Sequence, residues 1–282
     1  QGLDVANTTI KGSPYSQGAL SSFFGRVNYN YKETYMLSAV LRADGSSNFK
    51  RGNRWGIFPS VSAGWVITNE PWMADTKSWL SFLKFRGSWG QNGNCNISNF
   101  QYLATIAFDA PYYFNDKDLP TTGAYPDILP NENVKWETSE QVDFGLDARF
   151  FKSRLGISFD WYDKMTKDWL VVAPTLLSYG TGAPYINGGD IRNRGYEILA
   201  TWNDNVGDLS YGASFTFSHN SNVVPRLANS EGIIHGGSNV LAQNTDELYR
   251  VEVGYPIGYF WGYEVEGIIQ NESDLQNYIG AN

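Results

Sequence analysis

The stretch FFGRVNYNYKETYMLSAVLRA, residues 23–43, decides the fold. Apolar and polar side chains alternate along both of its halves, which are separated by residues 32–34. A period of two places successive side chains on opposite faces of a strand. The stretch therefore predicts a hairpin with one apolar and one polar face. The apolar face carries Phe23, Gly25, Val27, Tyr29, Tyr31, Tyr35, Leu37, Ala39, Leu41 and Ala43.

The composition favours an all-β protein and excludes several other classes. The chain has 282 residues with 21 basic and 29 acidic side chains, a net charge of −8, which argues against nucleic acid as a partner. Aromatic residues make up 16% and there are 29 glycines, as expected for strands and turns. No apolar run approaches the roughly 18 residues that a membrane helix needs. With one cysteine, Cys95, and two separated histidines, we expect no cofactor and no metal site.

Further segments repeat the alternation of the hairpin. They are residues 60–67, 83–90, 138–150, 155–163, 195–202 and 209–218. With the two strands of the hairpin, the sequence predicts about eight antiparallel strands. Strands of about 9 to 11 residues, tilted near 45°, are long enough to cross a bilayer.

The connections alternate between short and long, and this pattern predicts an orientation. Segments 32–34, 151–154 and 203–208 are tight, segment 69–81 is intermediate, and segments 44–54, 91–134, 171–194 and 223 onward are long. Transmembrane β-barrels have short periplasmic turns and long extracellular loops. The fold expected is thus an antiparallel transmembrane β-barrel wall with its long loops outside the cell. Six aromatic residues near the short turns are expected to form the inner girdle: Tyr29, Tyr31, Tyr35, Phe150, Phe151 and Trp202.

The second face of the predicted strands is polar and is expected to line a wide, wet lumen. Apolar side chains would meet lipid on one face, and charged or amide side chains would meet water on the other. The expected lumen-facing residues are Arg26, Asn28, Arg42, Lys84, Arg86, Gln141, Asp143, Asp147, Arg149 and Asp160.

Several motifs, in order along the chain, resemble the SusC-like TonB-dependent transporters of the Bacteroidetes outer membrane. They are FGRVNY at 24–29, LRADGSSNF at 41–49, WGIFPSVSAGW at 55–65, LKFRGSWGQNGN at 83–94, KWETSEQ at 135–141, NRGYE at 193–197 and VGYPIGYFWGY at 253–263. The resemblance covers nearly the whole chain. Several motifs in family order are more specific than any one of them.

The resemblance implies a plan larger than this chain. Family members have a plug domain inside a barrel of about 22 strands, a segment that contacts TonB, and a SusD-like surface lipoprotein as a lid. Residues 1–282 are expected to be one partial barrel domain, without the plug, the TonB-contacting segment or the closing strands, so that the sheet stays open with unpaired edges near Leu20 and Ser218. The implied function is active import of glycan or peptide fragments across the outer membrane, with no enzymatic activity.

Aromatic side chains in the long loops are candidates for contact with a ligand or a lid protein. Flat rings stack on sugar faces or peptide groups, and tyrosine and tryptophan often anchor protein interfaces. The candidates are Tyr112, Tyr113, Phe114, Trp136, Trp169 and Tyr179. Packing within the loops would use the same residues, and the sequence does not separate the two roles.

Two other functions remain open from the sequence. A soluble cell-surface β-protein that binds or degrades carbohydrate would bury its apolar face against a second sheet, and the carboxylates of Asp143 and Asp147 invite a glycosidase hypothesis. A passive, plug-free porin would share the barrel wall but need no TonB. Hydrated lumen charges are the simpler interpretation of both aspartates.

Overall fold

A single antiparallel sheet dominates the computed structural model, which describes residues 18–112, 121–173, 177–238, 240, 243–265 and 267–281. The sheet has eight strands in the order β1-β2-β3-β4-β7-β8-β11-β12. These are β1 (Leu20–Tyr31), β2 (Tyr35–Ser46), β3 (Trp55–Val66), β4 (Leu80–Asn94), β7 (Glu137–Phe150), β8 (Leu155–Lys167), β11 (Gly189–Val206) and β12 (Leu209–Leu227). The predicted eight-stranded antiparallel wall is confirmed.

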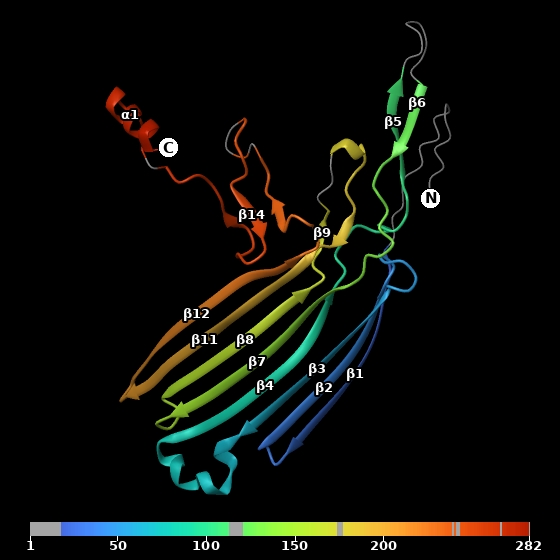
Figure 1. The fold of residues 1–282 in the computed structure, drawn as a ribbon. Coiled ribbons are helices and arrows are strands. Elements are labelled where there is room, and N and C mark those ends of the chain that lie inside the picture. Colours follow the sequence, from blue (N-terminus) through green and yellow to red (C-terminus); the bar gives the residue numbers. More distant parts are fainter. Residues whose placement is uncertain are drawn as a thin grey trace.

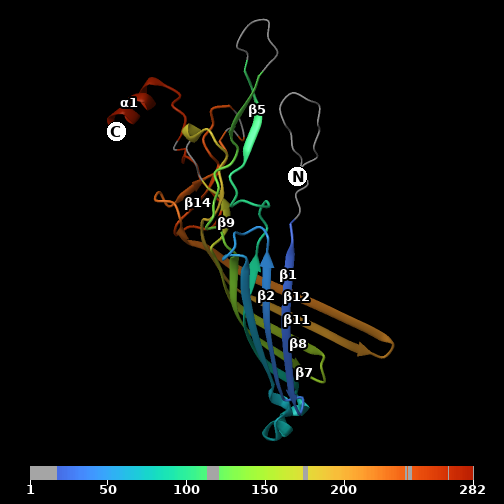
Figure 2. The same ribbon diagram turned by 90° about the vertical axis from the view of Figure 1, so that its right-hand side faces the viewer.

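The sheet is a curved wall that does not close on itself. In Figure 1 the strands lie side by side from β1 to β12, and in Figure 2, turned by 90°, the β11 and β12 strands swing away from the plane of β1 and β2. β1 pairs only with β2 and β12 only with β11 among the described residues. Both predicted edges are therefore edges of the sheet.

Turns and loops separate to opposite ends of the sheet, as Figures 1 and 2 show. One end has the tight turns and two short 3₁₀ helices, η1 (Ile67–Asn69) and η2 (Pro71–Ser78). The first turn holds Lys32 and Glu33 at φ of 52° and 54°, and the Asn30 side chain accepts a hydrogen bond from the Glu33 backbone at 3.0 Å. This contact supports a left-handed conformation that non-glycine residues adopt only with strain.

The long connections at the other end contain small elements of their own. They are β5 (Ile106–Tyr112), β6 (Thr121–Pro126), β9 (Leu170–Val172), η3 (Leu177–Tyr179), β10 (Tyr185–Asn187), β13 (Ile233–His235), β14 (Tyr249–Glu252), β15 (Tyr259–Phe260) and α1 (Glu272–Ala281). No helix in the described ranges is both long and apolar enough to span a membrane.

The last two long strands extend further than their alternation predicts. The predicted segments 195–202 and 209–218 lie inside β11 and β12. At the loop end β11 begins six residues before the first segment and β12 ends nine residues after the second, and the two strands are joined by a turn of two residues, Gly207 and Asp208. Beyond the apolar band both faces of a strand meet water, so alternation is lost. Backbone pairing continues there, for example Asn193 with Asn222, because ladder hydrogen bonds do not depend on apolar side chains.

The buried core lies at the base of the loops, where they meet the end of the sheet. Phe49, Phe58, Ile97, Val134 and Trp136 form one cluster, and Cys95, Leu170 and Tyr185 pack against it. Because these residues come from the connection after β2, from β3, from the connection between β4 and β7, and from β9 and β10, the cluster ties three loops to one another.

Aromatic side chains gather near the short turns, where the inner girdle was expected. Tyr31, Tyr35 and Trp65 form a stacked series with ring centroids 6.5 and 6.4 Å apart. Tyr35 Oη and Trp65 Nε1 both donate to Glu70 Oε1, at 2.5 and 3.0 Å. These two hydrogen bonds, that from Tyr35 first, hold the pKa of Glu70 below its usual value. A second aromatic group near the short turns includes Phe150, whose ring centroid lies 6.1 Å from that of Trp79 and 6.2 Å from that of Phe151.

Candidate functional site

The polar face of the sheet carries a charged cluster centred on Arg86 of β4. Its guanidinium donates to Asp147 of β7 (Nε to Oδ2, 3.0 Å) and to Asp160 of β8 (Nη2 to Oδ2, 2.8 Å). A third carboxylate, Asp143, lies 4.0 Å from Nη1. One cation therefore faces three carboxylates, and this part of the wall has an excess of negative charge.

A glycine allows Arg86 to reach across the neighbouring strand. Gly145 of β7 stands between Arg86 and Asp160 in the register of the three strands. A Cβ atom at position 145 would lie 2.4 Å from Cζ of Arg86 and 2.7 Å from Oδ1 of Asp160. The guanidinium thus lies flat on the wall because Gly145 has no side chain.

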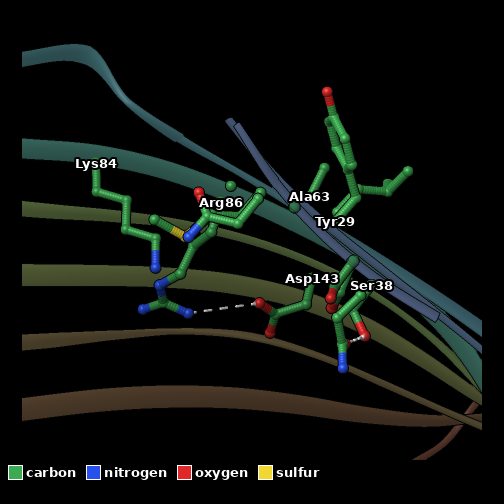
Figure 3. Close-up of a pocket in the computed structure, with 14 residues that line it drawn as sticks. Tyr29, Ser38, Ala63, Lys84, Arg86 and Asp143 are labelled. Atoms are coloured by element: carbon green, nitrogen blue, oxygen red, sulfur yellow. Dashed lines mark hydrogen bonds and ion pairs between the residues drawn. The ribbon is translucent and has the colours of Figure 1, made fainter. Parts of the chain in front are cut away.

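Beside this cluster the polar face is hollowed to a volume of about 500 Å³. Ser38, Ser62 and Ser88 stand in register on β2, β3 and β4 and form part of its floor. Figure 3 shows Ser38, Arg86 and Asp143 on one side of the strands and Tyr29 on the other. Hydroxyl groups in a row, followed by a carboxylate, offer hydrogen bonds to a polar solute that passes along the wall.

The register places every expected lumen-facing residue on this face. They are Arg26, Asn28, Arg42, Lys84, Arg86, Gln141, Asp143, Asp147, Arg149 and Asp160. The structure brings together the Arg86 group and, on β1 and β2, Asn28 with Ser38 (2.8 Å). Asp143 and Asp147 both lie near Arg86, at 4.0 Å from Nη1 and 3.0 Å from Nε, so both carboxylates face the same cation.

The apolar face is exposed along the whole sheet. Phe144, Phe159 and Phe217, in mid-strand positions, keep exposed fractions of 45%, 39% and 43%. No second sheet packs on this face in the part of the chain that the structure describes. Such exposure is unfavourable in water and favourable in lipid. The sandwich arrangement required by the soluble alternative is therefore not formed by the described residues.

The six aromatic loop candidates fall into different environments. Trp136 is buried: its ring packs against Phe49 and Phe58 at 5.5 and 5.4 Å, and its Nε1 donates to the Arg54 carbonyl at 2.8 Å. The ring has no free face to stack on a ligand, so Trp136 is a packing residue of the loop core. The sequence did not distinguish Trp136 from the exposed aromatic residues of the loops, because its burial results from the packing of three loops against one another.

Two other candidates remain accessible near the loops. Tyr179, at the end of η3, is 60% exposed, and Trp169 is partly buried beside β9. Tyr112 ends β5, but its side chain lies outside the described residues, as do Tyr113 and Phe114 altogether. The accessible candidates thus lie in the connection between β8 and β11, which packs against the loop core through Leu170 and Tyr185.

One titratable cluster in the loops has no counterpart in the sequence predictions. His235 of β13 contacts Glu247 through Nδ1 (2.7 Å) and Glu231 through Nε2 (3.1 Å). Hydrogen bonds to Glu231 and then Glu247 raise the pKa of His235 above its ordinary value. The two carboxylates approach different ring nitrogens. Among the described residues, no group of three or more histidine, cysteine or acidic side chains is arranged to hold a metal ion.

A curved antiparallel wall with an exposed apolar face, charge and hydroxyls on the other face, and all long loops at one end defines a class of protein, the transmembrane β-barrel of an outer membrane. Comparison with known proteins gives the family. The model of the "TonB dependent receptor-like, beta-barrel" family matches residues 2–275. The chain belongs to this family of outer-membrane transporters and receptors.

Curated relatives and solved structures agree with this assignment. The chain is 34% identical to TonB-dependent receptor P3 of Formosa agariphila over 271 residues, 95% of this chain and 26% of that protein. It is 32% identical to TonB-dependent receptor SusC of Bacteroides thetaiotaomicron, over 88% of this chain and 25% of SusC. A solved RagAB peptide transporter superposes with a TM-score of 0.75 at 27% identity, covering 86% of this chain and 25% of that one. The chain thus spans about a quarter of the length of these relatives.

Proposed function

We propose that this chain forms part of the barrel wall and extracellular loops of a SusC-like, TonB-dependent importer that takes up glycan or peptide fragments. The observation that carries the proposal is the two-faced wall: exposed apolar side chains on one face and, behind them, the hollow beside Arg86 with its row of serines. The same two-faced pattern continues through all eight strands, as a wide water-filled conduit requires.

The lining of the hollow supports the proposed substrate class. The serine row offers neutral donors and acceptors, and the Arg86 group adds carboxylates, a surface suited to hydroxyl-rich or amide-rich oligomers rather than to apolar compounds. The similarity to structures described as a peptide transporter supports peptides, and the similarity to SusC supports the same importer class. No covalent chemistry is required of the wall.

Energy and selectivity would come from segments beyond this wall. TonB would act on a plug domain inside the barrel, and residues 1–282 would be one partial barrel domain of that larger protein. A SusD-like lipoprotein would close over the loops, where Tyr179, Trp169 and the aromatic residues 112–114 are proposed to contact the lid or the substrate. Figure 1 shows β5, β6 and β9 beyond the same end of the sheet.

Uptake in matched strains tests the proposal. The complete gene is deleted in its host, and growth is measured on defined peptide mixtures and on oligosaccharides as sole nutrient. We expect loss of growth on one of these substrate classes, and an equal loss when TonB is deleted instead. Uptake that continues without TonB would favour the passive porin, and unchanged growth on all substrates would refute import.

A pull-down tests the lid contact separately. Tyr179→Ala should reduce the amount of lipoprotein that co-purifies with the complete gene product. Tyr211→Ala, an equally conservative loss on the membrane-facing side near the short turns, serves as the matched control because Tyr211 is also partly exposed, at 46%. Equal recovery of the lipoprotein with both variants would remove Tyr179 from the docking surface.

A further inference from the structure

A second arginine cluster lies on the face of the sheet that carries the apolar side chains. The cluster belongs neither to the polar face nor to the long loops. Arg192 and Arg194 of β11 both bind the same carboxylate, Asp163 of β8. Arg192 donates from Nε to Oδ1 at 2.9 Å and from Nη2 to Oδ2 at 2.6 Å. Arg194 donates from Nε and Nη2 to Oδ2 at 3.2 and 2.8 Å. The cluster has two cations for one carboxylate.

The register assigns this cluster to the membrane-facing side. Arg194 stands opposite Asp163, and two residues nearer the short turns Tyr196 stands opposite Trp161, followed by Ile198 opposite Phe159. Side chains two residues apart share a face of a strand. The arginines therefore lie on the same face as the apolar band, directly beyond its aromatic border.

The height of the cluster matches the outer membrane interface. Arg192 stands opposite Met165, ten residue steps beyond Leu155, where the apolar face of β8 begins. Ten steps of about 3.3 Å span about 33 Å along a strand, or about 25 Å along the membrane normal at a tilt near 40°. Because the apolar band of such barrels is about 25 Å tall, Arg192 lies at the level of the outer-leaflet headgroups, with Arg194 two residues nearer the short turns.

The cations are the accessible members of the cluster. The side chains of Arg192 and Arg194 are 40% and 50% exposed, whereas Asp163 is 18% exposed beneath them. Each guanidinium has five N–H donors and uses two of them on Asp163. No other hydrogen bond from either group is formed to the residues that the structure describes, so three donors on each remain for an external acceptor.

A neighbouring pair has the same arrangement. Lys167 binds Glu140 at 2.6 Å, and Trp89 donates from Nε1 to the same carboxylate at 2.9 Å. Lys167 is 51% exposed and Glu140 27%. Here too the carboxylate is the inner partner and the cation the outer one. By contrast, the Arg86 cluster on the lumen face has one cation for three carboxylates.

We infer that the Arg192–Arg194 pair, with Lys167 beside it, binds the phosphate groups of a lipid headgroup in the outer leaflet, namely the phosphorylated glycolipid lipid A. Arginine binds phosphate oxygens through paired N–H donors. Basic groups at membrane interfaces bind anionic headgroups. Asp163 holds both guanidinium groups in place, so the phosphate meets a pre-organised pair of cations. This role is independent of what the transporter imports.

Native mass spectrometry of the complete gene product in detergent tests the inference. The probe is bisphosphorylated lipid A, added to delipidated protein, and the measured quantity is the fraction of protein that retains it. Near a membrane surface each cation contributes about 1 kcal/mol, so R192Q/R194Q should weaken retention about 20-fold to 30-fold. R192K/R194K preserves both charges and should stay within about fivefold of the parent protein.

The matched control is Arg154→Gln. Arg154 forms an arginine–aspartate pair with Asp204 at 3.1 Å and is 51% exposed, but it lies at the short-turn end of β8. Retention by this variant should equal that of the parent protein. Retention by R192Q/R194Q within twofold of the parent, or an equal loss with Arg154→Gln, would overturn the inference.

Two further arms test the phosphate and its source. Lipid A without its phosphates should be retained about 20-fold less by the parent protein, and equal retention would overturn the inference. Inorganic phosphate at millimolar concentration should leave bound lipid A in place. Displacement by it would assign the cluster to free phosphate and reject the lipid. The lysine variant, which keeps both charges, shows in each arm that the measured loss follows the charge and not the fold.

Discussion

Removing Trp136 should release the extracellular loops while the sheet remains intact. The ring is 8% exposed, packs between Phe49 and Phe58, and donates to the Arg54 carbonyl. Truncation of a buried tryptophan to alanine costs about 3 to 5 kcal/mol. Because a tenfold change in an equilibrium constant corresponds to about 1.4 kcal/mol, opening of the loop core should become roughly a hundred-fold to a few thousand-fold more frequent.

Hydrogen exchange of backbone amides in the complete gene product measures this opening. In Trp136→Ala, exchange should accelerate by roughly a hundred-fold or more at Ile97 and Val134, which belong to the same core, up to the limit set by a fully open loop. Amides in mid-sheet, such as those of Phe144 and Phe159, should exchange as before, because their ladder does not include the core.

Two variants sharpen the result. Trp136→Phe retains most of the ring but leaves the Arg54 carbonyl without its donor, which costs about 1 kcal/mol and should accelerate exchange about fivefold. Trp72→Ala removes a tryptophan that is 64% exposed at the opposite rim and should change nothing in the loops. If Trp136→Ala accelerates the loop amides no more than Trp72→Ala, the loop core does not hold the mouth together.

Three other perturbations test the remaining parts of the structure. The pKa of His235 is raised in the folded loop, so the stability that protonated His235 adds to the loop should be complete below pH about 6.5 and be lost as the pH rises through the folded pKa. Amide exchange around β13 should show this pH dependence, and His235→Gln should abolish it. Arg86→Met leaves its carboxylates without their cation and should destabilise the barrel by about 1 to 3 kcal/mol in urea unfolding, whereas Arg26→Met should have a smaller effect because Arg26 is exposed and hydrogen-bonds only Asn28 among the described side chains. In vesicles, Val27→Arg on the lipid face should cost about 2 to 4 kcal/mol and Asn28→Arg on the adjacent lumen position about zero, and equal costs would reverse the assignment of the two faces.

The strand assignments were predictable from residues 23–43 and their repeats because alternation is a local property. Each pair of neighbouring residues already specifies which faces of a strand are apolar. The limits of β11 and β12 were not predictable in this way, since their outer ends carry polar residues on both faces, such as Arg192 and Asn193. In that region only pairing with a neighbouring strand extends the ladder.

The candidate site was predictable as a face but not as a set of contacts. Arg86, Asp143, Asp147 and Asp160 were all expected on one polar face, and the register places the four on the same face of the sheet. Their association depends on Gly145, whose missing side chain lets Arg86 cross β7. A glycine in a strand has many possible roles. The role of Gly145 becomes clear only from the register, which places Arg86 on one neighbouring strand and Asp160 on the other.

The sequence by itself determined the two faces of the wall, the number of long strands and which end carries the loops, because these depend on periodicity and on the lengths of connections. Tertiary structure alone decided that Trp136 is buried among three loops, that Arg86 gathers three carboxylates, and that Arg192 and Arg194 share Asp163. Each of these arrangements joins residues that are distant in the chain. The register of neighbouring strands and the packing of loops bring them together, and no local pattern encodes either.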